Sequence, residues 1–195
     1  MKAKDVETRE RILAAGGALM WKHGISRITV GEICRKAGVS KMTFYKHFEN
    51  KVAVAKAVLQ RSVDELWSKV VEIMDRPIPF HDKVGLYIQL RLEQTEAWSQ
   101  EIARELLEDS IPGMAEFVNG LRQSILDKTI AMFRHFQETG DIRRDIKPEF
   151  LLSMLNRLTE TAKDRDLMAL YPSFQTFVKE IMEFLFYGML PGARA

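Results

Sequence analysis

Residues 40–51 of this 195-residue chain are rich in side chains that donate hydrogen bonds or carry positive charge. The stretch contains three lysines, a serine, a threonine, a tyrosine and a histidine, against one acidic residue. Ammonium and hydroxyl groups commonly bind phosphate oxygens, and hydroxyl and small apolar groups contact the edges of bases. A short exposed helix with these side chains is therefore suited to binding nucleic acid.

Residues typical of an enzyme active site do not occur in a recognisable arrangement. The four histidines are scattered, and there is no His-Glu-x-x-His pair, glycine-rich phosphate loop or Gly-x-Ser-x-Gly turn. His81 is adjacent to Asp82, but this pair is expected to begin a helix in solvent. We therefore expect no catalysis, no cofactor and no metal site.

The elements that position the basic segment are predicted to be two short helices joined by a tight turn. Thr29 and Glu32 have the spacing of a capping box, so one helix is expected to begin there. Gly38 can adopt the left-handed conformation that ends a helix, and Ser40 can cap the next one. Two short helices joined in this way form a helix-turn-helix, which places its second helix in the major groove of DNA.

The second of these helices is expected to have a buried and an exposed side. Phe44 and Phe48 are four residues apart and would anchor it on the core. A further helix is expected to start at Asn50–Lys51, where a helix N-terminus and a lysine suit a phosphate. The side chains left to face outward are those of Lys41, Met42, Thr43, Tyr45, Lys46 and His47.

Such a turn also occurs in helical proteins that bind no DNA, and the distribution of charge favours the DNA-binding interpretation. Residues 1–51 hold 11 lysines and arginines against 5 aspartates and glutamates, whereas the other 144 residues hold 18 against 22. The near-neutral chain is thus a basic head joined to an acidic body. A basic module with a helix-turn-helix is the electrostatic pattern expected of a DNA-binding protein.

The head closely resembles the N-terminal domain of the tetracycline-repressor-like (TetR) family. The resemblance is carried by Ile12–Ala15, Leu19, Gly24, Thr29–Ile33 and Ala37–Lys51, in register and without gaps. It covers roughly the first quarter of the chain. The sequence departs from the family pattern at core positions, with Gly16 and Gly17 in place of helix-favouring residues, Met20 in place of Phe and Cys34 in place of Ala.

Roles for the head follow from the residue types and from this resemblance. Phosphates would be held by Thr29, Lys41, Tyr45, Lys46 and Lys51, and base edges would be contacted by Lys41, Met42, Thr43 and His47. His47 has an alternative position, packed under Phe48. Replacing Lys51 is expected to weaken binding to every sequence alike and to reduce the salt slope by about one unit.

Beyond the head, apolar residues follow a helical period and no alternating strand pattern occurs. The predicted fold is all-α, with a three-helix DNA-binding domain at 1–51, extending into the start of the fourth helix, and an effector-binding and dimerisation domain at 52–195. The fourth helix is expected to run to the break at 75–79. Later helices are expected near 81–108, with a break suggested around Trp98, and at 114–139, 149–168 and 173–188.

The last two helices are candidates for a dimer interface, and the resemblance implies that they pair with their copies in a homodimer. The alternative is that they bury their apolar faces only within their own chain. A dimer would place two recognition helices about one DNA turn apart, roughly 34–36 Å, and so would bind a palindromic operator on double-stranded DNA. The candidate interface residues are Leu151, Met154, Leu155, Leu158, Phe174, Phe177, Val178, Ile181 and Leu185.

A small-molecule effector is expected from the resemblance, and its site would lie among aromatic and methionine residues of the body. Such side chains adapt to varied apolar shapes, but at helical spacing they also form ordinary cores. The candidate pocket residues are Trp67, Met74, Phe80, Tyr87, Trp98, Phe117, Phe133 and Phe136.

The single cysteine, Cys34, excludes an internal disulfide framework, and it is expected to be a small buried apolar residue rather than a redox sensor. No apolar run reaches membrane-spanning length, so a cytoplasmic protein without membrane contact is expected. We expect a dimeric regulator of transcription, and the resemblance implies a repressor that is released by a small apolar or amphipathic ligand. The alternative is a DNA-binding protein with an architectural or division-control role and no ligand switch.

Overall fold

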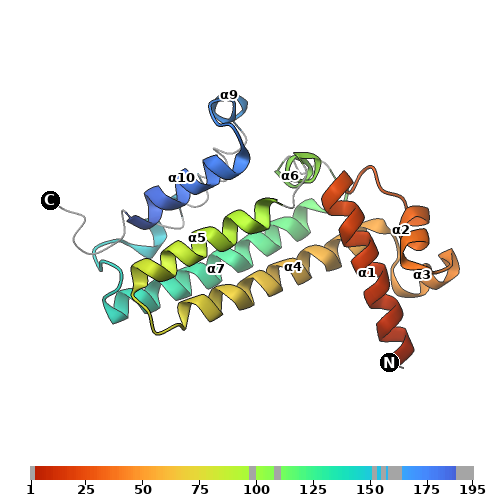
Figure 1. The fold of residues 1–195 in the computed structure, drawn as a ribbon, viewed down its shortest axis with the longest axis horizontal. Coiled ribbons are helices and arrows are strands. Elements are labelled where there is room, and N and C mark those ends of the chain that lie inside the picture. The colour runs from red at the N-terminus through yellow and green to blue at the C-terminus, as the bar shows by residue number, and fades with distance from the viewer. Residues whose placement is uncertain are drawn as a thin grey trace. The chain divides into compact units, whose positions relative to one another are not determined.

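Every regular element of the structure is a helix, in the part of the chain that the computed structural model describes. That part comprises residues 3–96, 100–107, 111–150, 153–154, 157 and 164–187. The all-α prediction is therefore confirmed for these residues, and none of their helices is long and apolar enough to cross a membrane. In order (Figure 1), the helices are α1 Ala3–His23, α2 Val30–Ala37, α3 Lys41–His47, α4 Lys51–Met74, α5 Phe80–Glu96, α6 Gln100–Leu107, α7 Ala115–Thr139, α9 Arg165–Met168 and α10 Phe174–Tyr187.

The helix-turn-helix forms as its local signals predict. The Thr29 hydroxyl accepts a hydrogen bond from the Glu32 N–H at 3.2 Å, and the Glu32 carboxylate accepts one from the Thr29 N–H at 2.8 Å. Gly38 ends α2 with φ 65° and ψ 39°, a left-handed conformation that glycine adopts without steric cost. The Ser40 hydroxyl then accepts from the Thr43 N–H at 3.0 Å and caps α3. The predicted capping box, turn and second cap are confirmed.

The core beneath this motif is built from apolar residues of α1, α2, α3 and α4, of the loop between α1 and α2, of α6 and of the segment at the start of α7. Figure 1 shows α2 and α3 (orange) beside α1 (red). Cys34 is buried, as expected for a small apolar residue. Asn50 begins α4 by accepting a hydrogen bond from the Ala53 N–H at 2.9 Å, at the predicted start. The largest fully buried side chains of this core are Phe44, Ile12, Leu13, Met20, Ile25, Ile33, Ile102, Met114 and Val54.

Two compact units divide the chain, and the division does not follow the predicted domain boundary. One unit comprises Met1–Ser68 and Ala97–Leu121, and the other comprises Lys69–Glu96 and Arg122–Ala195. The head expected at 1–51 thus packs with the first part of α4, with α6 and with the start of α7. A functional boundary at residue 51 stays a prediction.

The second unit contains the later helices, and their bounds agree with several predicted breaks. α10 packs against α5, and Phe80 stacks on Phe136 with ring centroids 4.6 Å apart. The helix predicted over 149–168 is interrupted, because Asp164 is not helical and its carboxylate accepts from the N–H groups of Asp166 and Leu167 at the start of α9. The break suggested near Trp98 lies at residues outside those described.

Candidate nucleic-acid interface

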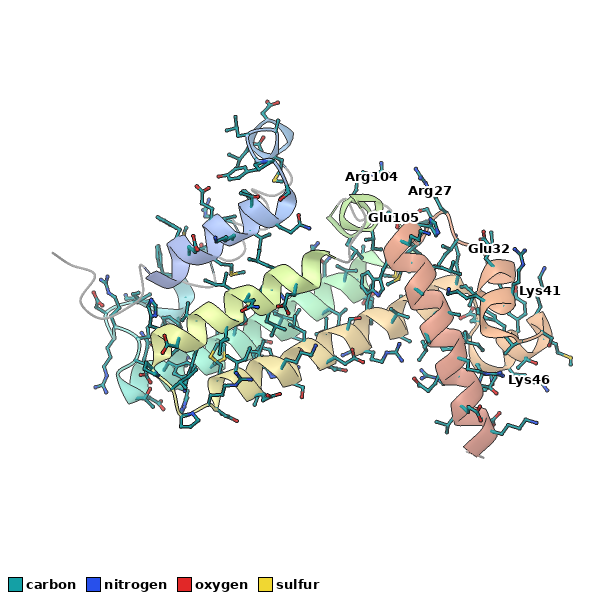
Figure 2. All side chains as sticks on the ribbon, viewed as in Figure 1. Arg27, Glu32, Lys41, Lys46, Arg104 and Glu105 are labelled. Atoms are coloured by element: carbon teal, nitrogen blue, oxygen red, sulfur yellow. The ribbon has the colours of Figure 1, made fainter. Side chains whose placement is uncertain are left out.

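α3 has several exposed side chains on its outer face, while its inner face packs on the core. Phe44 is fully buried, and its ring centroid lies 5.4 Å from that of Tyr45 and 6.1 Å from that of Phe48. On the other side, 71% of Met42 and 56% of Tyr45 are exposed, a large fraction for residues of this kind. Lys41 and Lys46 are also exposed, and in Figure 2 both lie on the side of the head away from Glu105. The structure therefore brings four of the predicted contact residues onto one surface.

Two predicted contact residues, Thr29 and Thr43, use their hydroxyls in helix caps. Thr29 Oγ1 donates to Glu32 Oε2 at 2.8 Å and Thr43 Oγ1 lies 2.9 Å from Ser40 Oγ. Thr29 is exposed, and Thr43 is half-buried. Each hydroxyl oxygen keeps lone-pair capacity, and the methyl group of Thr43 is available for an apolar contact such as one with thymine.

The capping box also sets the ionisation of a carboxylate beside this surface. The hydrogen bond from the Thr29 hydroxyl, followed by that from the Thr29 N–H, holds the pKa of Glu32 below its ordinary value. A lowered folded-state pKa means that these bonds stabilise the folded protein above the pKa of the unfolded chain. That contribution is lost as the pH falls through the lowered folded-state pKa.

Replacing Thr29 with valine should raise the pKa of Glu32 toward its ordinary value, because the hydroxyl donor is lost while the shape is kept. The loss of the cap should also reduce stability by about 0.5–2 kcal/mol. An NMR titration of the Glu32 carboxyl in wild type and Thr29→Val would measure the shift. Thr29→Ser is the matched control, since it keeps the hydroxyl, and an identical pKa in all three proteins would contradict the assignment.

Lys51 occupies the predicted start of α4, but its ammonium group is engaged within the protein. Lys51 Nζ donates to the carbonyl oxygens of Ser26 at 2.7 Å and of Ile28 at 2.8 Å. An ammonium group has three N–H donors, so one remains for an outside acceptor. The predicted phosphate contact stays a prediction, and the structure adds a second role in holding the loop between α1 and α2.

His47 is turned toward α1 rather than outward, and its alternative position, packed under Phe48, stays a prediction. Only 11% of its side chain is exposed, and its Nε2 lies 3.9 Å from Asp5 Oδ1 of α1. The structure therefore does not place His47 with the exposed residues of α3. A role in holding α3 against the start of α1 accounts for its position, and contact with a base edge would require it to move.

Two residues in or bonded to the loop between α1 and α2 were not predicted. Arg27 is exposed in the loop before Thr29 (Figure 2), where a cation ahead of a capping box is a signal that sequence reasoning could have used. Glu105 of α6 is buried and bonds to the same loop, with Oε2 accepting from the Ile25 N–H at 2.6 Å. No sequence pattern indicates a contact between residues 80 positions apart.

The candidate pocket residues are divided between the two compact units, and their grouping in one pocket stays a prediction. Trp67 and Phe117 belong to the first compact unit, and the others that are described belong to the second. Phe80 and Phe136 belong to the core, because their rings pack against each other. The Phe136 ring is also contacted by Lys83, whose Nζ lies 5.7 Å from the ring centroid. Met74, Phe80, Phe133 and Phe136 are buried, Tyr87, Trp67 and Phe117 are half-buried, and Trp98 lies outside the described residues.

The candidate interface residues of α10 differ in their exposure. Phe177, a predicted interface residue, is buried within its own chain with its ring centroid 5.1 Å from that of Tyr171, which agrees for this residue with the alternative of packing within one chain. Val178 and Ile181 are half-buried, as is Met154. Phe184, one turn beyond Ile181, is 74% exposed. The side chains of Phe174 and Leu185, and residues Leu151, Leu155 and Leu158, lie outside what the structure describes.

The arrangement of α2 and α3 defines a helix-turn-helix protein, and known proteins resemble the chain in sequence and in fold. The family model of bacterial regulatory proteins, tetR family, matches residues 12–58. The HTH-type transcriptional repressor BepR of Brucella suis biovar 1 is 32% identical over 155 residues, which cover 76% of this chain and 73% of BepR. The chain therefore belongs to the tetR family of bacterial regulatory proteins, which are DNA-binding transcriptional regulators and not enzymes.

Other similar proteins match part of the chain or its fold alone. The nucleoid occlusion factor SlmA of Vibrio cholerae is 29% identical over 94 residues, so the chain spans about half of that relative's length, 48%. The structure of the transcriptional regulator FadR from Bacillus subtilis in complex with stearoyl-CoA has a TM-score of 0.68 at 16% identity. The matched region covers 92% of this chain and 98% of the FadR chain.

Proposed function

We propose that this chain is a repressor that binds a palindromic operator as a homodimer and is released by a small apolar or amphipathic ligand. The observation that carries the proposal is the outer face of α3. Lys41 and Lys46 supply cations for phosphates, and Met42 and Tyr45 stand exposed on a helix locked from beneath by Phe44. A rigid helix with exposed side chains can hold base contacts in register.

The dimer and the effector are supported by separate observations. Exposure of large apolar groups such as Phe184 and Phe150 in the second unit favours an interface that covers them. BepR, which the chain covers over most of its length, is named as a repressor. A ligand of amphipathic character is supported by the likeness in fold to the FadR that binds stearoyl-CoA.

The experiment that tests the proposal is selection of bound sequences from a random duplex library, followed by fluorescence anisotropy on the enriched sequence. A palindrome bound by two subunits is expected, with Tyr45→Ala losing at least about tenfold in affinity, the size of one or two good contacts. Addition of stearoyl-CoA to the complex would test release. Weak, salt-sensitive binding with no enriched sequence would overturn the proposal.

The second candidate is a DNA-binding protein with a role in division control and no ligand switch. The similarity to the nucleoid occlusion factor SlmA over 94 residues favours it. The same selection separates the two candidates once the enriched sequence is mapped on the genome of the source organism. Sites beside promoters favour the repressor, whereas many dispersed sites favour the second candidate.

A further inference from the structure

The loop that joins α1 to α2 has backbone groups that neither helix satisfies. α1 ends at His23, and the next residue, Gly24, has a φ of 81° that turns the chain away and an N–H that bonds back to the Met20 carbonyl at 2.8 Å. Ile25 and Ile28 anchor the loop in the core, where both are buried. Thr29, which follows directly, is the cap of α2. The path of this loop therefore decides where the N-terminus of α2 lies.

Glu105 of α6 holds the amide side of this loop. Its Oε2 accepts from the Ile25 N–H at 2.6 Å and its Oε1 accepts from the Ser26 N–H at 3.0 Å, so each carboxylate oxygen binds one amide. Only 2% of Glu105 is exposed. A buried carboxylate is costly unless it is hydrogen-bonded, and bonds to a charged acceptor are stronger than neutral ones. Figure 2 shows Glu105 at the C-terminal end of α1.

Lys51 holds the carbonyl side of the same loop, through its bonds to the Ser26 and Ile28 oxygens. Ser26 is therefore held from both sides, since its N–H donates to Glu105 and its C=O accepts from Lys51. The two charged residues come from α6 and α4, and they meet on one residue of the loop. A carboxylate and an ammonium group joined through a backbone segment can polarise and reinforce each other's hydrogen bonds.

We propose that Glu105 is a positioning residue for DNA binding, which acts with Lys51 through the backbone of Ser26 to hold the loop before α2. This inference rests on the proposed function, because its readout is operator affinity. α6 thereby acts on the N-terminus of α2 through this loop, and any displacement of Glu105 frees the Ile25 and Ser26 amides. If the loop is released from one side, a smaller fraction of the protein has the conformation that binds DNA. The apparent affinity for the operator then falls in proportion to that fraction.

The test is a double-mutant cycle of Glu105→Gln and Lys51→Met on the selected operator. Glutamine keeps the shape but offers only one acceptor oxygen, so about a tenfold loss of operator affinity is expected for the folded protein. Because both residues act through Ser26, the double variant should lose less than the product of the two single losses. The matched control is Glu116→Gln, which alters an exposed carboxylate of α7 in the same compact unit and should bind like wild type.

A second readout separates positioning from general loss of structure. Hydrogen exchange of the Ile25 and Ser26 amides should accelerate at least about tenfold in Glu105→Gln, while the amides within α2 and α3 keep their protection. Wild-type exchange at both amides, wild-type operator affinity or strictly multiplicative losses in the cycle would each overturn the inference. If the wild-type protein selects no operator, the proposed function fails, and exchange alone still tests the role of Glu105.

Discussion

Replacing Phe44 with alanine is expected to lower the free energy of unfolding of the head by about 3–5 kcal/mol, the range for large-to-small changes at buried aromatic positions. Phe44 is fully buried and lies at the centre of α3, a helix of only seven residues. A helix this short is unstable by itself, so it depends on packing. Chemical denaturation followed by circular dichroism would measure the loss.

The matched control for Phe44 lies on the opposite side of the same helix. Met42→Ala removes a side chain that is 71% exposed, so stability should change by no more than about 0.5 kcal/mol. Its effect should instead fall on which operator sequences are preferred. A loss of less than about 1 kcal/mol in Phe44→Ala would show that α3 is held by other contacts. The inner and outer faces of α3 thus separate folding from recognition.

Local signals were sufficient to predict the helix-turn-helix. The capping box at Thr29, the left-handed glycine at 38 and the cap at Ser40 involve residues within three or four positions of each other. Such interactions depend on few variables, and hence they can be read directly from residue types. The same holds for Phe44 and Phe48, whose burial follows from the helical period.

Contacts between segments that are far apart in the chain could not be predicted from the sequence. The bonds from Glu105 to the loop at Ile25 and Ser26 depend on where α6 packs, which no periodicity encodes. His47 has the residue type of a base contact, yet its direction on α3 turns it toward Asp5. Phe177 fits an apolar stripe, but a stripe does not state which partner covers it, and here the chain itself does.

The glycines of α1 show how such a distant contact reverses a local expectation. A glycine inside a helix is less favourable than alanine by about 1 kcal/mol, so Gly16 and Gly17 are expected to destabilise α1. In the structure, a Cβ at Gly16 would lie 2.5 Å from Val54 Cγ1 of α4, and one at Gly17 would lie 3.3 Å from Val58 Cγ1. The missing side chains therefore allow α1 and α4 to approach closely.

Replacing Gly16 with alanine is expected to destabilise the protein by about 1–2 kcal/mol, because overpacking outweighs the gain in helix propensity. Val54 is buried and β-branched, and it has few ways to move its methyl group aside. The added methyl should be tolerated once the space is made, so the combined Gly16→Ala and Val54→Ala changes should cost less than their sum. Thermal and denaturant unfolding of the four proteins would measure this coupling.

Gly120 supplies the matched control for the close approach at Gly16. It lies inside α7 on an exposed position, and no atom lies within 4 Å of the place that its Cβ would take. Gly120→Ala should therefore stabilise the protein by up to about 1 kcal/mol, the full gain in propensity. If Gly16→Ala stabilised the protein to the same extent, α1 and α4 would have to be free to separate. The distance between these two helices would then be set by something other than the contact of Gly16 with Val54.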